Sequence, residues 1–396
     1  MIVQPKFRGF ICTTAHPLGC SVHVKQQIDY IKKHKPLSGP RNVLVIGAST
    51  GYGLASRVAA AFGANANTIG VFYERPAKET RTATAGWYNT AAFEQEAHRV
   101  GLYAKSINGD AFSNVVKQEV IDLIKADLQA VDLVIYSIAS PRRTDPVDNQ
   151  TYTSTLKPIG KSFQGKTVDF HTGEVSTVTI EPAAEAEIAA TVKVMGGEDW
   201  QLWIEALLEN EVLAENCTTL AYSYIGPEIT YPVYRDGTIG RAKEHLEATA
   251  HRLNQLLTAL NGKAYVSVNK AVVTQSSAAI PVVPLYVSLL FRVMKEKGLH
   301  EGCIEQIYRL FSEKMAGSKV ETDSDGRIRL DDWELRPDVQ EEVLKLWEQI
   351  DSKNIGAISD LEGFRTEFFR LFGFEFPGVD YSQDVDANVP IPSIMI

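Results

Sequence analysis

A tyrosine and a lysine, Tyr234 and Lys243, are separated by eight residues in a segment that reads YPVYRDGTIGRAKEHL from Tyr231. A phenol with an ordinary pKa of about 10 becomes a useful proton donor when a nearby positive charge favours its ionised form. Such a pair would serve a reduction, in which negative charge develops on an oxygen of the substrate. By spacing alone, an interface tyrosine beside a surface lysine is the favoured interpretation.

The stretch GASTGYG, from Gly47 to Gly53, has two interpretations. As G-x-S-x-G it would be the nucleophile elbow of a hydrolase, with Ser49 as the nucleophile. As a glycine turn between a strand and a helix it would bind the pyrophosphate of a dinucleotide through backbone N–H groups. A hydrolase elbow usually follows several strands, whereas only one strand of the series precedes this turn, and His245 and His251 lie on a charged helix that reads as solvated. The dinucleotide interpretation is therefore favoured.

A carboxylate at the expected distance supports the dinucleotide site. Glu74 follows the second predicted strand and lies 21 residues after Gly53, where an acid accepts hydrogen bonds from the adenosine ribose and favours NAD over NADP. Arg75 beside it could instead receive a 2′-phosphate. Asp110 is either an adenine neighbour or an ordinary helix-entry acid. The predicted cofactor contacts of this half are Gly47, Ala48, Ser49, Thr50, Gly51, Tyr52, Tyr73, Glu74, Asp110, Ala111, Ile138 and Ala139.

Apolar strands that alternate with helical patterns would position these residues. Strands are predicted over 42–46, 68–73, 102–107, 133–138, 218–224 and 264–268. Helices are predicted between them over 54–62, 89–100 and 113–125, the last capped by Ser113. Continuous apolar strands separated by helices are typical of a parallel sheet covered on both faces. The predicted fold class is α/β, a doubly wound Rossmann-like parallel sheet.

Two regions are predicted to enlarge this sheet. A polar, β-like insertion covers about 141–181, with a hairpin turn at His171–Gly173. After Ser277 the chain is predicted to be helical to its end, over 285–297, 303–314, 338–350 and 360–372. We predict one enlarged domain over 1–396, with a core at about 40–275 and substrate-side helices and a C-terminal extension at about 276–396.

Composition and charge exclude several classes of protein. A formal net charge of −9 argues against a protein that mainly neutralises nucleic acid or an anionic membrane. The apolar stretch 278–291 contains two prolines and is shorter than the roughly 20 residues that cross a bilayer. The first residues do not resemble a signal peptide, and the four cysteines show no CxxC spacing, which predicts a cytoplasmic protein with free thiols.

Two sequence patterns could indicate a metal site, but neither matches a known pattern well. Cys12, His16 and Cys20 match no common zinc spacing. The run ETDSDGRIRLDD, from Glu321 to Asp332, resembles a calcium loop, but its first and twelfth positions depart from that pattern. A solvent hairpin turned by Asp325–Gly326 is the simpler interpretation, and no metal is predicted.

Over its full length the chain resembles the FabV family of enoyl-acyl-carrier-protein reductases, also described as trans-2-enoyl-CoA reductases. The resemblance rests on FICTTAHPLGC, VLVIGASTGYGLA, YSIASPRR, MGGEDW, KAVVTQ and LLFRVMKEKGLHEGCIEQ. It implies NADH-dependent reduction of the trans-2 double bond of an enoyl thioester in fatty acid synthesis. The carrier, coenzyme A or acyl carrier protein, is left open, and we expect a monomer.

The resemblance also implies roles for particular residues. Tyr234 would donate the proton, and Lys243 would contact the cofactor ribose and tune the tyrosine. Tyr224 would contact the substrate. Val272, Val273 and Thr274 in KAVVTQ would approach the nicotinamide. Family members often carry a second lysine where this chain has Glu244, which affects the expected efficiency rather than the reaction class.

Other interpretations remain beside this one. The stretch 278–291 would line the acyl chain's tunnel and move as a lid, or would be a core helix. A carbonyl reductase or epimerase on the same scaffold would use the same glycine turn, as would a non-catalytic NAD(H)-sensing protein.

Overall fold

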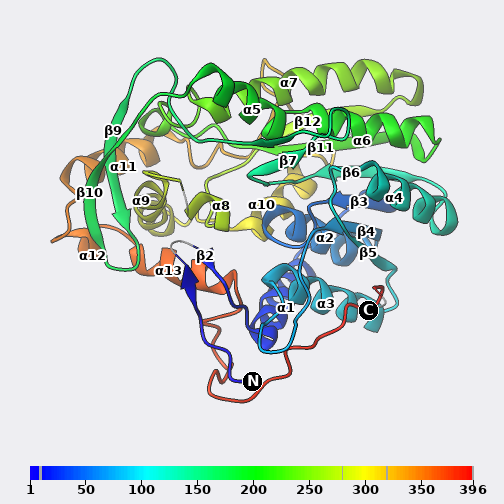
Figure 1. Cartoon of the computed structure of the whole chain (residues 1–396), viewed down its shortest axis with the longest axis horizontal. Coiled ribbons are helices and arrows are strands. Elements are labelled where there is room, and N and C mark those ends of the chain that lie inside the picture. Colours follow the sequence, from blue (N-terminus) through cyan, green and yellow to red (C-terminus); the bar gives the residue numbers. More distant parts are fainter. Residues whose placement is uncertain (9–10, 279, 318–319, 395–396) are drawn as a thin grey trace.

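The computed structural model describes residues 1–8, 11–278, 280–317 and 320–394. Within this part of the chain the central element is a seven-stranded parallel sheet of spatial order β13-β12-β11-β6-β3-β4-β5 (Figure 1). Its strands are β3 (Asn42–Ile46), β4 (Asn67–Phe72), β5 (Ala104–Asn108), β6 (Val131–Tyr136), β11 (Leu213–Ser223), β12 (Lys263–Val268) and β13 (Ile328–Arg329). The chain order reverses between β3 and β6, so a crevice opens at the carboxyl ends of these two strands.

Helices cover both faces of the sheet, because its strands are apolar on both sides. Val43 and Val45 of β3 face one core, whereas Leu44 and Ile46 face the other. The first core is covered by α1 (Pro17–Lys33), α2 (Gly51–Ala64), α3 (Ala85–Arg99) and α10 (Cys303–Arg309). The second is covered by α4 (Asn114–Asp127), α6 (Glu198–Glu209) and α7 (Thr238–Leu256). The predicted doubly wound sheet is confirmed, as is Ser113 as the cap of α4, since its side chain accepts from the Val116 N–H.

The predicted β insertion forms two hairpins. They are β7 (Arg142–Thr144) with β8 (Thr151–Thr153), and β9 (Phe163–Asp169) with β10 (Glu174–Ile180). The second turns at Gly173, as predicted, where φ is +81°. Lys166 Nζ of β9 donates to the carbonyl oxygens of Trp347, Glu348 and Ile350 at the end of α11 (Pro337–Gln349). The insertion is thus tied to the C-terminal region, beside α11 and α12 (Figure 1).

A third hydrophobic core lies under the C-terminal region. It is built on α9 (Val283–Glu296), with α11 and α13 (Leu361–Arg370) packed against it. The shorter helices here are α8 (Gln275–Ala278), a π-helical turn at Leu310–Lys314 and α12 (Ile355–Ile358). The four predicted helices are confirmed to within a few residues. Because α9 is buried along most of its length, the core-helix interpretation of 278–291 holds for it, while Ala279 of that stretch lies outside the described residues.

The prediction of helix from Ser277 to the end of the chain is wrong in two places. Ile328 is fully buried in β13, which pairs with β12 at the edge of the sheet, so the segment after the Asp325–Gly326 turn is not a solvent hairpin. Past Leu371 the described chain is not helical and runs along α3, with the Trp87 and Tyr88 side chains donating to the carbonyls of Val389 and Ala387. A two-residue strand is too short to show alternation in a sequence.

The remaining elements were not predicted or are short. They are α5 (Glu185–Met195), the N-terminal pair β1 (Phe7–Arg8) and β2 (Ile11–Cys12), and 3-10 turns at Glu228–Thr230 and Leu257–Leu260. Phe10 of the N-terminal motif lies outside the described residues. None of the helices in the described chain is long and apolar enough to cross a membrane.

Candidate active site

The glycine turn lies at the crevice between β3 and β6. Gly47 has φ +90°, and a Cβ there would lie 2.1 Å from the Ser137 carbonyl oxygen, which follows β6. A Cβ on Gly53 would lie 1.9 Å from the Gly47 carbonyl oxygen. Both positions therefore require glycine so that strand, turn and helix can approach closely. Gly51, with φ +54°, has no atom within 4 Å of a built Cβ and faces open space.

The first turn of α2 fits the pyrophosphate of a dinucleotide. Its cap residue Thr50 makes no side-chain hydrogen bond to the helix amides, and no acidic residue lies in the first turn. These N–H groups, at the positive end of the helix dipole, are thus open to an anion. Ala48 is fully buried beneath the turn. The residues present fit the cofactor half that the sequence predicted.

The carboxylate of Glu74 lies beside this turn. Its Oε1 accepts from Ser49 Oγ at 2.7 Å, and a Cβ on Gly86 of α3 would lie 2.0 Å from the same oxygen. Asn108 fixes its backbone, donating to the Glu74 carbonyl and accepting from the Glu74 N–H. Burial raises the pKa of Glu74, while hydrogen bonds and the neighbouring Arg75 lower it. The Ser49 hydroxyl donates to Glu74 and, among the described residues, makes no hydrogen bond to a histidine. A hydrolase nucleophile would need a histidine as its base, so this contact does not fit a hydrolase.

His245 was predicted to be solvated, and this is wrong. It is half-buried, and its Nδ1 accepts from the Gly197 N–H before α6. A polar helix face concealed this contact, because the partner lies on another helix. His251 is exposed as predicted.

The other predicted cofactor residues follow neighbouring strands at the same edge of the sheet. Asp110 follows β5 and accepts from the Phe112 N–H, a contact that also fits the ordinary helix-entry role. The Ala111 carbonyl accepts from Lys117 Nζ and from Trp203 Nε1. Ile138 and Ala139 follow β6; Ile138 is partly exposed and Ala139 is exposed. Their contact with a cofactor stays a prediction.

Tyr73 and Arg75 flank Glu74 at the surface. Tyr73 is 79% exposed, so its ring is open to a planar partner such as adenine. The Arg75 backbone is held by Thr84, and no hydrogen bond of its guanidinium is found among the described residues. Tyr52, in contrast, is turned inward, donating to the Lys270 carbonyl and to Gln306 Oε1. It therefore links α2 to the segment after β12.

The segment that begins at Lys270 is predicted to approach the nicotinamide. Val272 and Val273 are buried, and Thr274 opens α8. Ser277 holds the turn, accepting from the Thr274 N–H and donating to the Val272 carbonyl. This local network fixes the backbone of the stretch independently of the sheet.

Tyr234 and Tyr224 lie together on the substrate side. Tyr224 directly follows β11, and its ring meets that of Tyr234 edge-to-face, with centroids 4.8 Å apart and planes at 83°. Tyr234 lies in a turn segment whose backbone is held by the Thr230 carbonyl. No hydrogen bond of its hydroxyl to another described residue is found. Burial and the negative charge of Glu334 raise the pKa of Tyr234, so the phenol keeps its proton.

Lys243 lies in the second turn of α7. Its Nζ is 3.5 Å from the Tyr222 carbonyl oxygen of β11, and burial lowers its pKa to about 8 against the opposing charge of Glu247. Tyr222 in turn packs on Tyr52 of α2. Lys243 therefore lies between the two halves of the site, whereas Glu244 is exposed and paired with Arg241. The effect of Lys243 on Tyr234 stays a prediction.

Sequence reasoning missed Glu334, which is 0% exposed. Its Oε1 accepts from the hydroxyls of Tyr224 at 2.9 Å and Tyr286 at 2.6 Å, and its Oε2 accepts from the Ala271 N–H at 2.7 Å. Next to Asp331, Asp332 and Trp333 in the sequence, it resembles one more solvated acid. No spacing in the sequence connects it to these partners, which precede it by 110, 48 and 63 positions.

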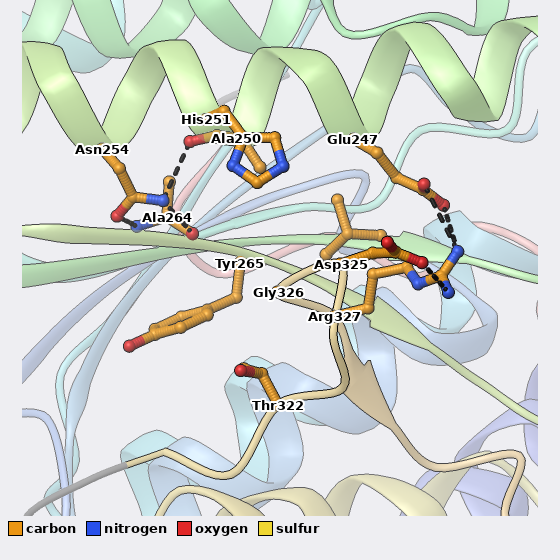
Figure 2. A pocket seen from close by; sticks show the side chains of 11 residues that line it. Glu247, Ala250, His251, Asn254, Ala264, Tyr265, Thr322, Asp325, Gly326 and Arg327 are labelled. Atoms are coloured by element: carbon orange, nitrogen blue, oxygen red, sulfur yellow. Dashed lines mark hydrogen bonds and ion pairs between the residues drawn. The ribbon is translucent and has the colours of Figure 1, made fainter.

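A cavity between α7, β12 and the 322–327 loop is lined by none of the predicted site residues (Figure 2). Figure 2 shows Glu247 paired with Arg327, while His251 and Tyr265 border the space. The acids of this loop are neutralised by arginines, since Asp323 and Asp325 both pair with Arg327. Among the described residues, no group of three or more His, Cys, Asp or Glu side chains is placed to hold a metal. His16 instead caps α1, accepting from the Gly19 N–H.

Comparison with known proteins gives one consistent family. Residues 81–316 match the catalytic region of trans-2-enoyl-CoA reductase, and residues 2–79 match its NAD(P)H binding domain. A trans-2-enoyl-CoA reductase [NADH] of Ruminiclostridium cellulolyticum is 61% identical over 100% of both chains. An enoyl-[acyl-carrier-protein] reductase [NADH] of Flavobacterium johnsoniae is 62% identical, again over 100% of both. The crystal structure of Treponema denticola trans-2-enoyl-CoA reductase in complex with NAD has a TM-score of 0.94 at 52% identity, covering 97% of this chain and 98% of that one.

A third match, over residues 322–385, is to a family described as an enoyl reductase FAD binding domain. This segment does not fit a flavin dinucleotide site of the strand–turn–helix kind. Its strand β13 has two residues, and α11 begins with Pro337 and an acid, Asp338, where a pyrophosphate would need free amides. Instead, the segment contributes Val339, Val343 and Phe364 to the third hydrophobic core.

Proposed function

Since the chain belongs to the trans-2-enoyl-CoA reductase family and is an NADH-dependent reductase of enoyl thioesters, we propose that Tyr234 is its proton donor. The observation that carries this proposal is the Tyr224–Tyr234 pair at the end of β11, with the Tyr234 hydroxyl free of described protein partners and its pKa raised. A phenol that holds its proton until negative charge appears beside it can act as a general acid.

The glycine turn would hold the cofactor and Glu74 its ribose, with Lys243 between the cofactor and β11. The chemistry that NADH supplies when bound is a hydride for C3 of the enoyl group. Tyr234 would donate a hydrogen bond to the thioester oxygen, where negative charge develops as the double bond is lost. A proton then reaches C2, and the product is the saturated acyl thioester. The place of this reaction in fatty acid synthesis, like the monomeric state and the cytoplasmic location, stays a prediction.

An absorbance assay at the NADH band tests the proposed reaction. Crotonyl-CoA should be reduced with NADH and more slowly with NADPH, because Glu74 would repel a 2′-phosphate. A β-ketothioester of the same length is the matched control for a carbonyl reductase. Oxidation of NADH with the ketone alone would favour that alternative, and no oxidation with either would favour a sensor. The crotonyl group on acyl carrier protein compares the two carriers in the same assay.

The catalytic role is tested separately with Tyr234→Phe. The variant should bind NADH as the wild type does, measured by quenching of protein fluorescence, and should lose most of its turnover. Turnover at the wild-type rate would remove Tyr234 from the chemistry without affecting the assignment of the reaction.

A further inference from the structure

Glu334 contacts Tyr224 and the Ala271 backbone directly, and it is connected to Tyr234 through the ring of Tyr224. It comes from the segment between β13 and α11, which no sequence motif connects with the site. The carboxylate binds the end of β11 through Tyr224, the segment after β12 through Ala271, and α9 through Tyr286. One side chain of the C-terminal region thus fixes three separate elements around the reacting position.

The hydrogen-bond directions favour the carboxylate form of Glu334. The Ala271 N–H can only donate, so Oε2 is an acceptor. Tyr286 Oη accepts from Gln340 Nε2 at 3.2 Å, which directs its own proton at Oε1. Burial raises the pKa of Glu334 above its ordinary value, and the positive charge of Lys270, whose Nζ donates to the Ala271 carbonyl, offsets part of this rise. Three donors and a nearby cation stabilise a carboxylate in a buried site.

This arrangement determines which phenolic proton is available. The proton of Tyr224 is directed at Glu334, so it is turned away from any substrate bound against Tyr234. The Tyr234 hydroxyl has no such acceptor among the described residues. Tyr234 also lies on a turn rather than on a helix or strand, and the Tyr224 ring is the aromatic surface against which its ring rests.

We propose that Glu334 is a positioning residue of the active site: its carboxylate binds the phenolic proton of Tyr224, fixes that ring against Tyr234, and leaves the Tyr234 proton as the one directed to the substrate. The proposal rests on the proposed function of Tyr234. It gives the segment 322–385 a role in the reductase site without a flavin, because this segment delivers the carboxylate.

The test compares Glu334→Gln, Tyr224→Phe and the double variant with wild type, using crotonyl-CoA and NADH. An amide of equal size retains the packing but loses the charge. Glu334→Gln should lower kcat by roughly ten- to a hundredfold, as expected when a charged acceptor in an active site is lost. The KM for crotonyl-CoA and the Kd for NADH should stay within about twofold, because Ser277 holds 272–274 without Glu334.

The double variant shows whether Glu334 acts through Tyr224. Because both changes act on the same Tyr224–Glu334 hydrogen bond, one by weakening it and the other by removing it, kcat of the double variant should equal that of the slower single variant within about twofold. Tyr286→Phe is the matched control, since it removes the other phenol from Oε1 and leaves the Tyr224 bond intact. Its kcat should lie above that of Glu334→Gln.

Three outcomes would overturn the proposal. They are a wild-type kcat in Glu334→Gln, a loss in the double variant that is the product of the two single losses, and a fall in NADH affinity as large as the fall in kcat. If Glu334→Gln does not fold, Tyr224→Phe alone decides, because it should fold and lose kcat by a similar factor. Failure of the proposed function gives a different result, namely wild-type turnover in Tyr234→Phe.

Discussion

The cofactor half and the substrate half of this site are built in different ways. The pyrophosphate and ribose part of the proposed cofactor half lies within one strand–turn–helix–strand unit, from β3 to Glu74, where backbone amides exposed by a glycine turn would bind the cofactor. The substrate half combines side chains from four places: the residue after β11, a turn before α7, α9 and the segment after β13. A site made of local backbone depends on spacing, whereas a site made of distant side chains depends on the complete fold.

Tyr234→Phe should break the substrate half and leave the cofactor half intact. Removing a general acid lowers rates by roughly a hundred- to ten-thousandfold, so kcat should fall in this range. NADH binding, followed by fluorescence, should change by less than about twofold. A variant that lost turnover and NADH binding together would show that the two halves of the site are not separate.

Gly53→Ala should break the cofactor half. Its Cβ would lie 1.9 Å from the Gly47 carbonyl oxygen, and backbone must shift to relieve this overlap. Overpacking of this kind costs roughly 1–3 kcal/mol, so NADH affinity and thermal stability should both fall. For thermal stability, Gly51→Ala is the matched control, because its Cβ meets no protein atom and only the left-handed backbone opposes it, at about 1 kcal/mol. Equal losses of thermal stability in the two variants would contradict the close approach of strand and helix.

Lys243 lies between the halves, and its titration sharpens the comparison. Its pKa of about 8 lies below the ordinary 10.5, so the charge is lost as pH rises through about 8. kcat/KM for NADH should then fall, by roughly tenfold per pH unit if the charge is essential. Lys243→Arg keeps its charge in this range and should lack this decline. A decline that persists in the arginine variant would have another origin.

The lowered pKa of Lys243 affects stability in the opposite direction, since the folded protein becomes more stable as pH rises. Burial disfavours the charged form, so the penalty is complete below pH 8, where Lys243 is charged in both folded and unfolded chains. As pH rises from about 8 to 10.5 the folded protein releases the proton first, and the contribution of Lys243 to the free energy of unfolding increases. The difference in free energy of unfolding between wild type and Lys243→Met, measured by urea unfolding, should be smaller at pH 10 than at pH 7.

Glu74→Gln should have the smallest effect, on cofactor choice. The neutral amide keeps the Ser49 contact but no longer repels a 2′-phosphate beside Arg75, so the preference for NADH over NADPH should fall by several-fold to about tenfold. Kinetics with both cofactors measure it. An unchanged ratio would mean that Glu74 does not face the ribose.

The contrast between the halves also explains what the sequence could predict. The strand at 42–46, the glycine turn and Glu74 are close in sequence, so apolar runs and spacing were sufficient to predict that they lie together. The helix α6 was missed although Trp200, Trp203 and Leu207 follow a helical period, because it lies beyond the irregular insertion and α5, which was not predicted either. In α1, polar residues such as Gln27 are buried and obscure the apolar face.

Glu334 could not be found in this way. Its significance comes from Tyr224 and Tyr286, which packing brings to it across 110 and 48 positions. The pair Tyr234 and Lys243 is an intermediate case: the two share a segment, yet the described structure shows no hydrogen bond between them, and their roles came from family resemblance. Side-chain sites of this kind require the fold before they can be interpreted.

The positions at which hydrogen enters the product test the central claim most directly. Crotonyl-CoA is reduced either with NADH deuterated at C4 in water or with ordinary NADH in deuterium oxide, and the butyryl product is analysed by NMR. We predict deuterium at C3 in the first case and at C2 in the second, with Tyr234→Phe forming either product far more slowly. Cofactor deuterium at any carbon other than C3, or unaltered turnover in Tyr234→Phe, would contradict a site in which bound NADH faces C3 and Tyr234 supplies the proton.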